Sequence, residues 1–144
     1  MPHTIRLRGP WNLQHDILDD PLRFQVPGAV PVGELPELEN VRLTRSFNRP
    51  TGLNAATQVF LCGQVRAIAL SVSVNQTTKF DCQAEAESLE SAAAIKPKRF
   101  RIEIADVLED ANLLILTVPV ADSLAIEEVW LEIEDSADDD AVDR

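Results

Sequence analysis

Residues 99–118 read RFRIEIADVLEDANLLILTV, and this stretch decides the fold class. Its first part alternates apolar and charged side chains, which places Phe100, Ile102 and Ile104 on one face of a strand. Its last part, residues 112–118, is almost continuously apolar, as is typical of a central strand covered on both faces. Between the two parts, a short segment favours a single helical turn. The stretch therefore predicts two strands joined by a turn.

The same alternation recurs along most of the chain. Residues 57–62 and 66–74 are both rich in β-branched and apolar residues, and Gly63 and Gln64 between them predict a turn. Many short strands with turn signals between them are typical of a sandwich or a barrel. We expect an all-β protein, a jelly-roll β-sandwich of roughly eight to nine strands. The expected strands are residues 4–8, 11–14, 22–26, 41–47, 57–62, 66–74, 99–104, 112–118 and 128–133.

The chain of 144 residues is long enough to bury a core without a metal or a disulfide. Apolar residues make up 45% of it, so we expect a folded globular domain rather than a disordered chain. We expect one domain over residues 1–134, with an Ala- and Glu-rich insertion near residues 83–97. Residues 135–144 are too acidic and too poor in apolar residues to fold alone, which predicts a disordered tail.

The net charge of −11 argues against nucleic acid and anionic membranes as partners, because both attract proteins rich in Lys and Arg. No apolar run has the form of a signal peptide or the length of a membrane span. We therefore expect a soluble, cytoplasmic protein whose cysteines are reduced. Cys62 lies in an apolar run and is expected to be buried.

Groups that could carry catalysis or bind a metal are scarce. Two cysteines without CxxC spacing and two histidines do not form the pattern of a zinc site, so we expect no metal and no cofactor. A nucleophilic mechanism needs a base beside a Ser or Cys, but His15 lies in a polar stretch typical of a surface. Glu128 and Glu132 are expected to be solvated charges on a strand face. We expect no catalytic residue.

A series of short motifs supports a more specific interpretation. These motifs are, in chain order, Gly9 and Trp11; Val26, Pro27 and Gly28; Arg45, Phe47 and Pro50; Val74 and Asn75; and Asp106, Leu108, Asn112 and Leu114. Their order resembles the galactose-binding-like jelly-roll domain, and most closely the sugar-binding domain at the N-terminus of family 2 glycoside hydrolases. The resemblance spans residues 5–133. This sequence departs from the family pattern at Gln76, which replaces a hairpin glycine, and in the insertion that follows.

The resemblance implies a binding module rather than an enzyme. The family's catalytic carboxylates lie in a separate barrel domain, for which this chain has no room. Trp11 matches a family position that fills the core. We therefore expect a non-catalytic module whose ligand is unknown, with carbohydrate favoured by the resemblance. The alternative is a protein-interaction or assembly domain.

Trp130 is the first candidate for ligand binding. Alternation places it opposite Val129 and Leu131, on a face that also carries Glu128 and Glu132. An exposed indole can stack on a sugar ring or contact a protein partner. The alternative is that Trp130 covers the rim of the sandwich or packs under the loop of residues 29–40, which its prolines predict.

Arg45, Asn48 and Arg49 form the second candidate group. They lie near the end of an expected strand, where loops of a jelly roll can hold a ligand. The Arg49 guanidinium could bind a carboxylate through two parallel hydrogen bonds. The alternative is that these arginines pair with nearby acids and hold the loop in place.

Overall fold

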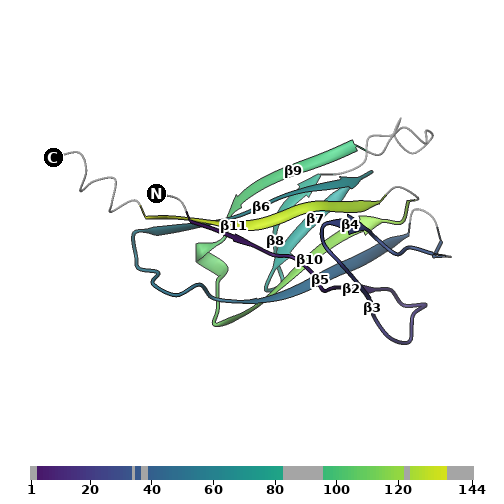
Figure 1. Ribbon diagram of the computed structural model, residues 1–144, viewed down its shortest axis with the longest axis horizontal. Coiled ribbons are helices and arrows are strands. Elements are labelled where there is room, and N and C mark those ends of the chain that lie inside the picture. The colour runs from purple at the N-terminus through teal and green to yellow at the C-terminus, as the bar shows by residue number, and fades with distance from the viewer. Residues whose placement is uncertain (1–2, 34, 37–38, 83–95, 122–123, 136–144) are drawn as a thin grey trace.

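The alternating segments of the sequence form strands in the computed structural model, which describes residues 3–33, 35–36, 39–82, 96–121 and 124–135. Within these ranges, a 3-10 turn at Ala105–Val107 is the only helical segment. It lies where a single helical turn was expected. The strands are β1 (His3–Arg6), β2 (Trp11–Gln14), β3 (Leu22–Phe24), β4 (Gly28–Ala29), β5 (Asn40–Asn48), β6 (Thr57–Ala67), β7 (Leu70–Val74), β8 (Thr77–Cys82), β9 (Lys96–Glu103), β10 (Ala111–Pro119) and β11 (Ala125–Asp135) (Figure 1).

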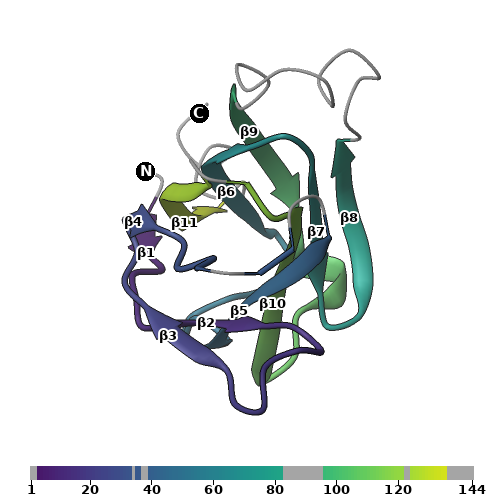
Figure 2. The same cartoon turned by 90° about the vertical axis from the view of Figure 1, so that its right-hand side faces the viewer.

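The strands form two antiparallel sheets that face each other across one core (Figure 2). The first sheet has the order β1-β11-β6-β9, and β4 pairs with the other end of β11. The second sheet has the order β3-β2-β5-β10-β7-β8. This architecture confirms the predicted all-β jelly-roll sandwich. Sequence neighbours often lie in different sheets, since β5 belongs to the second sheet and β6 to the first.

The core consists of the inward-facing side chains of both sheets. Alternation along a strand turns every second residue toward the other sheet, so each strand contributes its apolar set to the core. Trp11 is fully buried, and its indole Nε1–H donates to the carbonyl oxygen of Leu7 over 2.9 Å. The expectation that Trp11 fills the core is thus confirmed. The largest fully buried side chains besides Trp11 are Leu13, Val41, Leu43, Leu61, Leu70, Ile104, Leu114, Leu116, Leu124, Ile126 and Leu131.

The expected turn at Gly63 and Gln64 is wrong. Residues 57–67 form one continuous strand, β6, and the chain turns only at residues 68–69. Gly63 lies in this strand because the Phe100 ring of β9 covers it: a Cβ at Gly63 would lie 2.6 Å from Cζ of Phe100. The glycine therefore makes room for an aromatic ring and does not mark a turn.

Two strands of the structure were not expected from the sequence. β4 contains only two residues, and β8 follows a tight turn at Asn75 and Gln76. Both turn residues have positive φ, 51° and 72°, as the two central residues of a type I′ hairpin turn require. The resemblance placed a hairpin at Val74 and Asn75, but the strand after it was not expected, because Gln76 stands where Asn-Gly is the usual signal for such a turn.

Most of the expected insertion and of the expected C-terminal tail lies outside the described residues. The expected insertion near 83–97 falls on residues 83–95, while residues 96 and 97 begin β9. Of the expected tail, Asp135 is the last residue of β11, and residues 136–144 are not described. In the part of the chain that the structure describes, no helix has the length and apolar character needed to cross a membrane.

Candidate functional site

Trp130 lies on the outer face of the first sheet. Its neighbours Val129 and Leu131 are 1% exposed and point into the core, so alternation turns the indole away from it. In the strand register, Cys62 of β6 lies beside Trp130, and Arg101 of β9 lies beside Cys62. The surface made by Cys62, Gln64, Arg99, Arg101, Trp130 and Glu132 is called the Trp130 face below.

Glu132 holds the Trp130 side chain in place. The indole Nε1–H donates to Oε2 of Glu132 over 2.8 Å, and the indole is half-buried. This hydrogen bond and the nearby Arg101 guanidinium favour the charged carboxylate, so they lower the pKa of Glu132. The ring is therefore fixed by an anionic acceptor rather than free to rotate.

Arg101 contacts three side chains that fix its position. Its guanidinium forms ion pairs with Glu132, at 3.3 Å, and with Glu134. Its Cζ also lies 3.7 Å from the centroid of the Phe60 ring, which is a cation–π contact. These contacts fix a planar cation on the same face as the indole, with β6 between their strands.

Cys62 lies on the same face as these side chains and is buried. It is 1% exposed, as expected from its apolar surroundings, yet its side chain points to the outer face rather than into the inner core. Burial, followed by the negative charge of Glu132, raises the pKa of the Cys62 thiol to about 12. Because the thiolate is the reactive form, burial and the raised pKa make Cys62 a weak nucleophile.

A shallow hollow of about 460 Å³ lies on the Trp130 face. Gln64 lies at its rim, where its Oε1 accepts from Nε of Arg99 over 2.6 Å and its Nε2 donates to Glu127 over 3.0 Å. An aromatic side chain bordered by fixed hydrogen-bonding groups is a typical arrangement for small-molecule recognition. None of the described residues in the loop of residues 29–40 lines this hollow.

Arg45 and Asn48 lie elsewhere, in a groove of about 410 Å³ between β1 and β5. Nε of Arg45 donates to the carbonyl oxygen of Arg8 over 2.8 Å, and Nη1 donates to the carbonyl oxygen of Ser46. Arg45 thus connects the segment after β1, in the first sheet, to β5 in the second. Asn48 is exposed at the end of β5.

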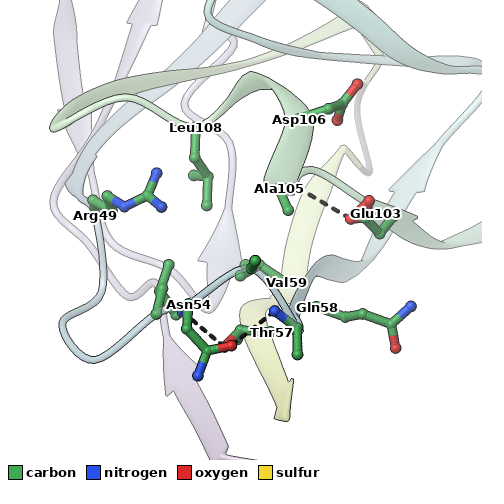
Figure 3. Close-up of a pocket in the computed structure, with 12 residues that line it drawn as sticks. Arg49, Asn54, Thr57, Gln58, Val59, Glu103, Ala105, Asp106 and Leu108 are labelled. Atoms are coloured by element: carbon green, nitrogen blue, oxygen red, sulfur yellow. Dashed lines mark hydrogen bonds between the residues drawn. The ribbon is translucent and has the colours of Figure 1, made fainter. Parts of the chain in front are cut away.

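Arg49 lies in a third place, a hollow of about 800 Å³ at one end of the sandwich (Figure 3). This end hollow is lined by the loop residues 49 and 53–57, by Gln58 and Val59 of β6, and by residues of the 103–108 segment. Arg49 is exposed and points into it. Among the predicted site residues, the structure brings only Arg45 and Asn48 into one groove, while Trp130 and Arg49 line two separate hollows.

The architecture was compared with that of known proteins. No family model matches the chain, and no curated protein matches it. Among solved structures, the FMN-binding β-glucuronidase from Facaelibacterium prausnitzii L2-6 superposes with a TM-score of 0.68 at 17% identity, covering 92% of this chain and 22% of that chain. The β-glucuronidase of Bifidobacterium dentium superposes with a TM-score of 0.66 at 15% identity, covering 93% of this chain and 30% of that chain.

The β-D-glucuronidase of Dictyoglomus thermophilum gives a TM-score of 0.66 at 13% identity, covering 92% of this chain and 28% of that chain. The chain has the fold of a domain within these glycoside hydrolases. This finding confirms the predicted resemblance at the level of the fold. The chain spans less than a third of each of these enzymes.

Several residues of the Trp130 face were missed by the sequence interpretation. Gln64, Arg99 and Arg101 join Trp130 on one face, although β6 and β9 are separated from β11 in the sequence. The alternation in residues 99–103 does show that Arg99 and Arg101 share a face. No sequence signal shows that this face adjoins Trp130, because strand pairing is not local.

His15 is not the surface histidine that was expected. Its side chain is 7% exposed, Nε2 lies 3.2 Å from Oε1 of Glu39, and Nδ1 accepts from the backbone N–H of Ile17 over 3.1 Å. Both ring nitrogens thus have partners that hold the turn after β2. Within the described ranges, no group of three or more His, Cys, Asp or Glu side chains is arranged to hold a metal ion.

Proposed function

We propose that this domain is a non-catalytic carbohydrate-binding module and that the Trp130 face is its binding surface. The single observation that carries the proposal is the fixed indole of Trp130 beside Arg99, Gln64 and Arg101 in one shallow hollow. The names of the proteins with the same fold support a sugar ligand, since they are β-glucuronidases. We also propose a cytoplasmic location, where Cys62 and Cys82 would stay reduced.

The chemistry of the Trp130 face suits a sugar. One side of a pyranose ring exposes C–H groups, which pack against a flat aromatic surface, while the hydroxyl groups lie around the ring edge. Arg99 and Gln64 present donors and acceptors at the rim of the hollow. Because Glu132 and Arg101 already hold their positions, little side-chain entropy is lost when a ligand binds.

Tryptophan fluorescence provides a direct test. The chain has two tryptophans, and Trp11 is fully buried, so a sugar that reaches the surface should change the emission of Trp130. Titration with a panel of mono- and oligosaccharides should give a saturable change for at least one ligand. Trp130→Ala should weaken that binding by tenfold or more, about 1.4 kcal/mol.

A matched control keeps the test specific. Leu113→Ala removes an apolar side chain that is 41% exposed on the second sheet, and it should leave sugar binding unchanged. Isothermal titration calorimetry on the same variants measures binding without relying on fluorescence. The proposal is wrong if no sugar in a broad panel binds the folded protein, or if Trp130→Ala binds as tightly as the original chain.

A protein partner is the second candidate function. Tryptophan and arginine are among the residue types most enriched at the energetic centre of protein interfaces, and Trp130 and Arg101 line the same hollow here. Sedimentation velocity over a range of concentrations should then show association that Trp130→Ala abolishes. A mass that stays monomeric at all concentrations, together with sugar binding, would favour the first candidate.

A further inference from the structure

We propose that the end hollow is a second ligand site, which binds a small carboxylate that also carries hydroxyl groups. In this proposal, Arg49 pairs with the carboxylate of the ligand. The proposal does not rest on the Trp130 face, because the two hollows share no lining residue.

The walls of the end hollow are held together before any ligand binds. The backbone N–H of Arg49 donates to the carbonyl oxygen of Asp110 over 3.0 Å, which ties the loop after β5 to the segment before β10. The loop itself is held by Asn54, whose Oδ1 accepts from the N–H of Ala56 over 2.8 Å and from the Thr57 hydroxyl over 3.2 Å. A site whose walls are already ordered loses little entropy on binding.

Two charged side chains of the hollow, Arg49 and Glu103, take part in none of the ion pairs found among the described residues. Asp106 is paired with Lys79, whose Nζ lies 3.0 and 3.1 Å from the two carboxylate oxygens. Among the residues that the structure describes, no acidic side chain or side-chain acceptor contacts the Arg49 guanidinium. The guanidinium points into the hollow from the side opposite Glu103 (Figure 3).

This layout selects the chemistry of the ligand. A guanidinium presents two parallel N–H groups that match the two oxygens of a carboxylate. At the opposite wall, Glu103 accepts one hydrogen bond from the N–H of Ala105, and it has further lone pairs for ligand hydroxyl groups. Between them, Leu53 and Leu108 provide an apolar surface for the carbon skeleton of the ligand.

The volume of the end hollow and the net charge of the protein both allow such a ligand to bind. A volume of about 800 Å³ lies within the usual range of small-molecule sites, about 300–1,000 Å³. The net charge of −11 repels an anion at long range. At physiological ionic strength, charges more than about 8 Å away are largely screened, so the contact with Arg49 decides binding.

The experiment is an NMR titration of the ¹⁵N-labelled full chain with three probes. D-Glucuronate and D-glucose differ only in the C6 carboxylate, and glycine carries a carboxylate and an ammonium group without hydroxyls. We expect D-glucuronate to shift the backbone amides of residues 53–57 and 105–108 in a saturable way. D-Glucose and glycine should bind at the end hollow, as reported by the same amides, at least tenfold more weakly.

Variants at Arg49 assign the effect to its guanidinium. Arg49→Gln should weaken D-glucuronate binding tenfold or more, and Arg49→Lys should weaken it less, because it keeps the charge and loses the paired N–H geometry. Arg23→Gln, at an exposed arginine of β3, is the control and should bind like the original chain. Thermal unfolding of each variant verifies that it is folded.

Three results would overturn the proposal. The first is the absence of shifts in the amides of residues 53–57 and 105–108 at saturating D-glucuronate. The second is D-glucose or glycine shifting the amides of residues 53–57 and 105–108 with the same affinity as D-glucuronate, since the ligand class of the end hollow would then be wrong. The third is a folded Arg49→Gln variant that binds D-glucuronate as the original chain does. Loss of sugar binding in Trp130→Ala tests the Trp130 face alone and leaves this site untouched.

Discussion

Asn75 and Asn112 share a side-chain hydrogen bond, in which Nδ2 of Asn75 donates to Oδ1 of Asn112 over 2.8 Å. Oδ1 of Asn112 also accepts from the N–H of Glu109 over 2.8 Å, and its Nδ2 donates to the carbonyl oxygens of Glu109 and Phe47. Oδ1 of Asn75 accepts from the N–H of Leu113 over 2.9 Å. Two amides thus connect the β7–β8 hairpin, the end of β5 and the start of β10.

Removing the Asn112 amide should destabilise the domain strongly. Asn112 is 3% exposed, so Asn112→Ala leaves several buried polar groups without partners. We expect the free energy of unfolding to fall by about 2–4 kcal/mol in urea denaturation followed by circular dichroism. The neighbouring Leu113→Ala, at an exposed position, should cost less than about 1 kcal/mol. A loss of stability for Asn112→Ala that is no larger than for Leu113→Ala would contradict the role of this network.

Gln76→Gly should stabilise the domain. Gln76 has a φ of 72°, which costs a residue with a Cβ about 1 kcal/mol or more and costs glycine nothing. After the greater entropy of glycine in the unfolded chain is subtracted, we expect a gain of up to about 1 kcal/mol in the free energy of unfolding. Gln58→Gly, in strand β6, is the control and should be destabilising. If Gln76→Gly and Gln58→Gly lower the free energy of unfolding equally, then the turn conformation differs from the one described.

The two cysteines should differ in reactivity. Cys62 is 1% exposed and its thiol pKa is raised to about 12, so at pH 8 roughly one molecule in ten thousand carries the thiolate. Cys82 is half-buried. Ellman's reagent should therefore modify Cys82 in the native protein and Cys62 only in denaturant. Trp130→Ala should speed the reaction of Cys62, because it removes the side chain beside it. Two equally fast thiols in the native protein would contradict the packing of this face.

Acid should weaken the Trp130–Glu132 contact. The pKa of Glu132 is lowered in the folded state, so its stabilising effect is fully present above the ordinary glutamate pKa of about 4.3. That effect is lost as the pH falls below this value and the carboxylate takes up a proton. The free energy of unfolding of Glu132→Gln should consequently depend less on pH between about 5 and 3 than that of the original chain.

Trp130 fluorescence should report the same titration. In the original chain the emission should change as Glu132 is protonated, and in Glu132→Gln this change should disappear. Glu109→Gln, at an exposed turn residue, is the control and should keep the fluorescence change. If Glu132→Gln keeps the full pH dependence of both stability and emission, then Glu132 does not titrate in the way described.

Much of the fold followed from local patterns in the sequence. The alternation in residues 99–104 and 128–133 correctly identified which side chains point inward, because the side-chain period of a strand is a local property. Trp11 and Cys62 were correctly expected to be buried. The predicted turn at Gly63 was wrong. A glycine that makes room for a large ring cannot be told from a turn glycine by the sequence alone.

The candidate sites depended far more on the tertiary structure. The sequence by itself determined that Trp130 lies on the face opposite the core and that Arg99 and Arg101 share a face of their strand. Only the pairing of β11, β6 and β9 decided that these faces are one surface, and only the sandwich decided that Arg45 and Arg49, four residues apart, line different hollows. The physical reason is that side-chain alternation is set by the backbone of each strand, whereas strand neighbours are chosen by burial of the whole core.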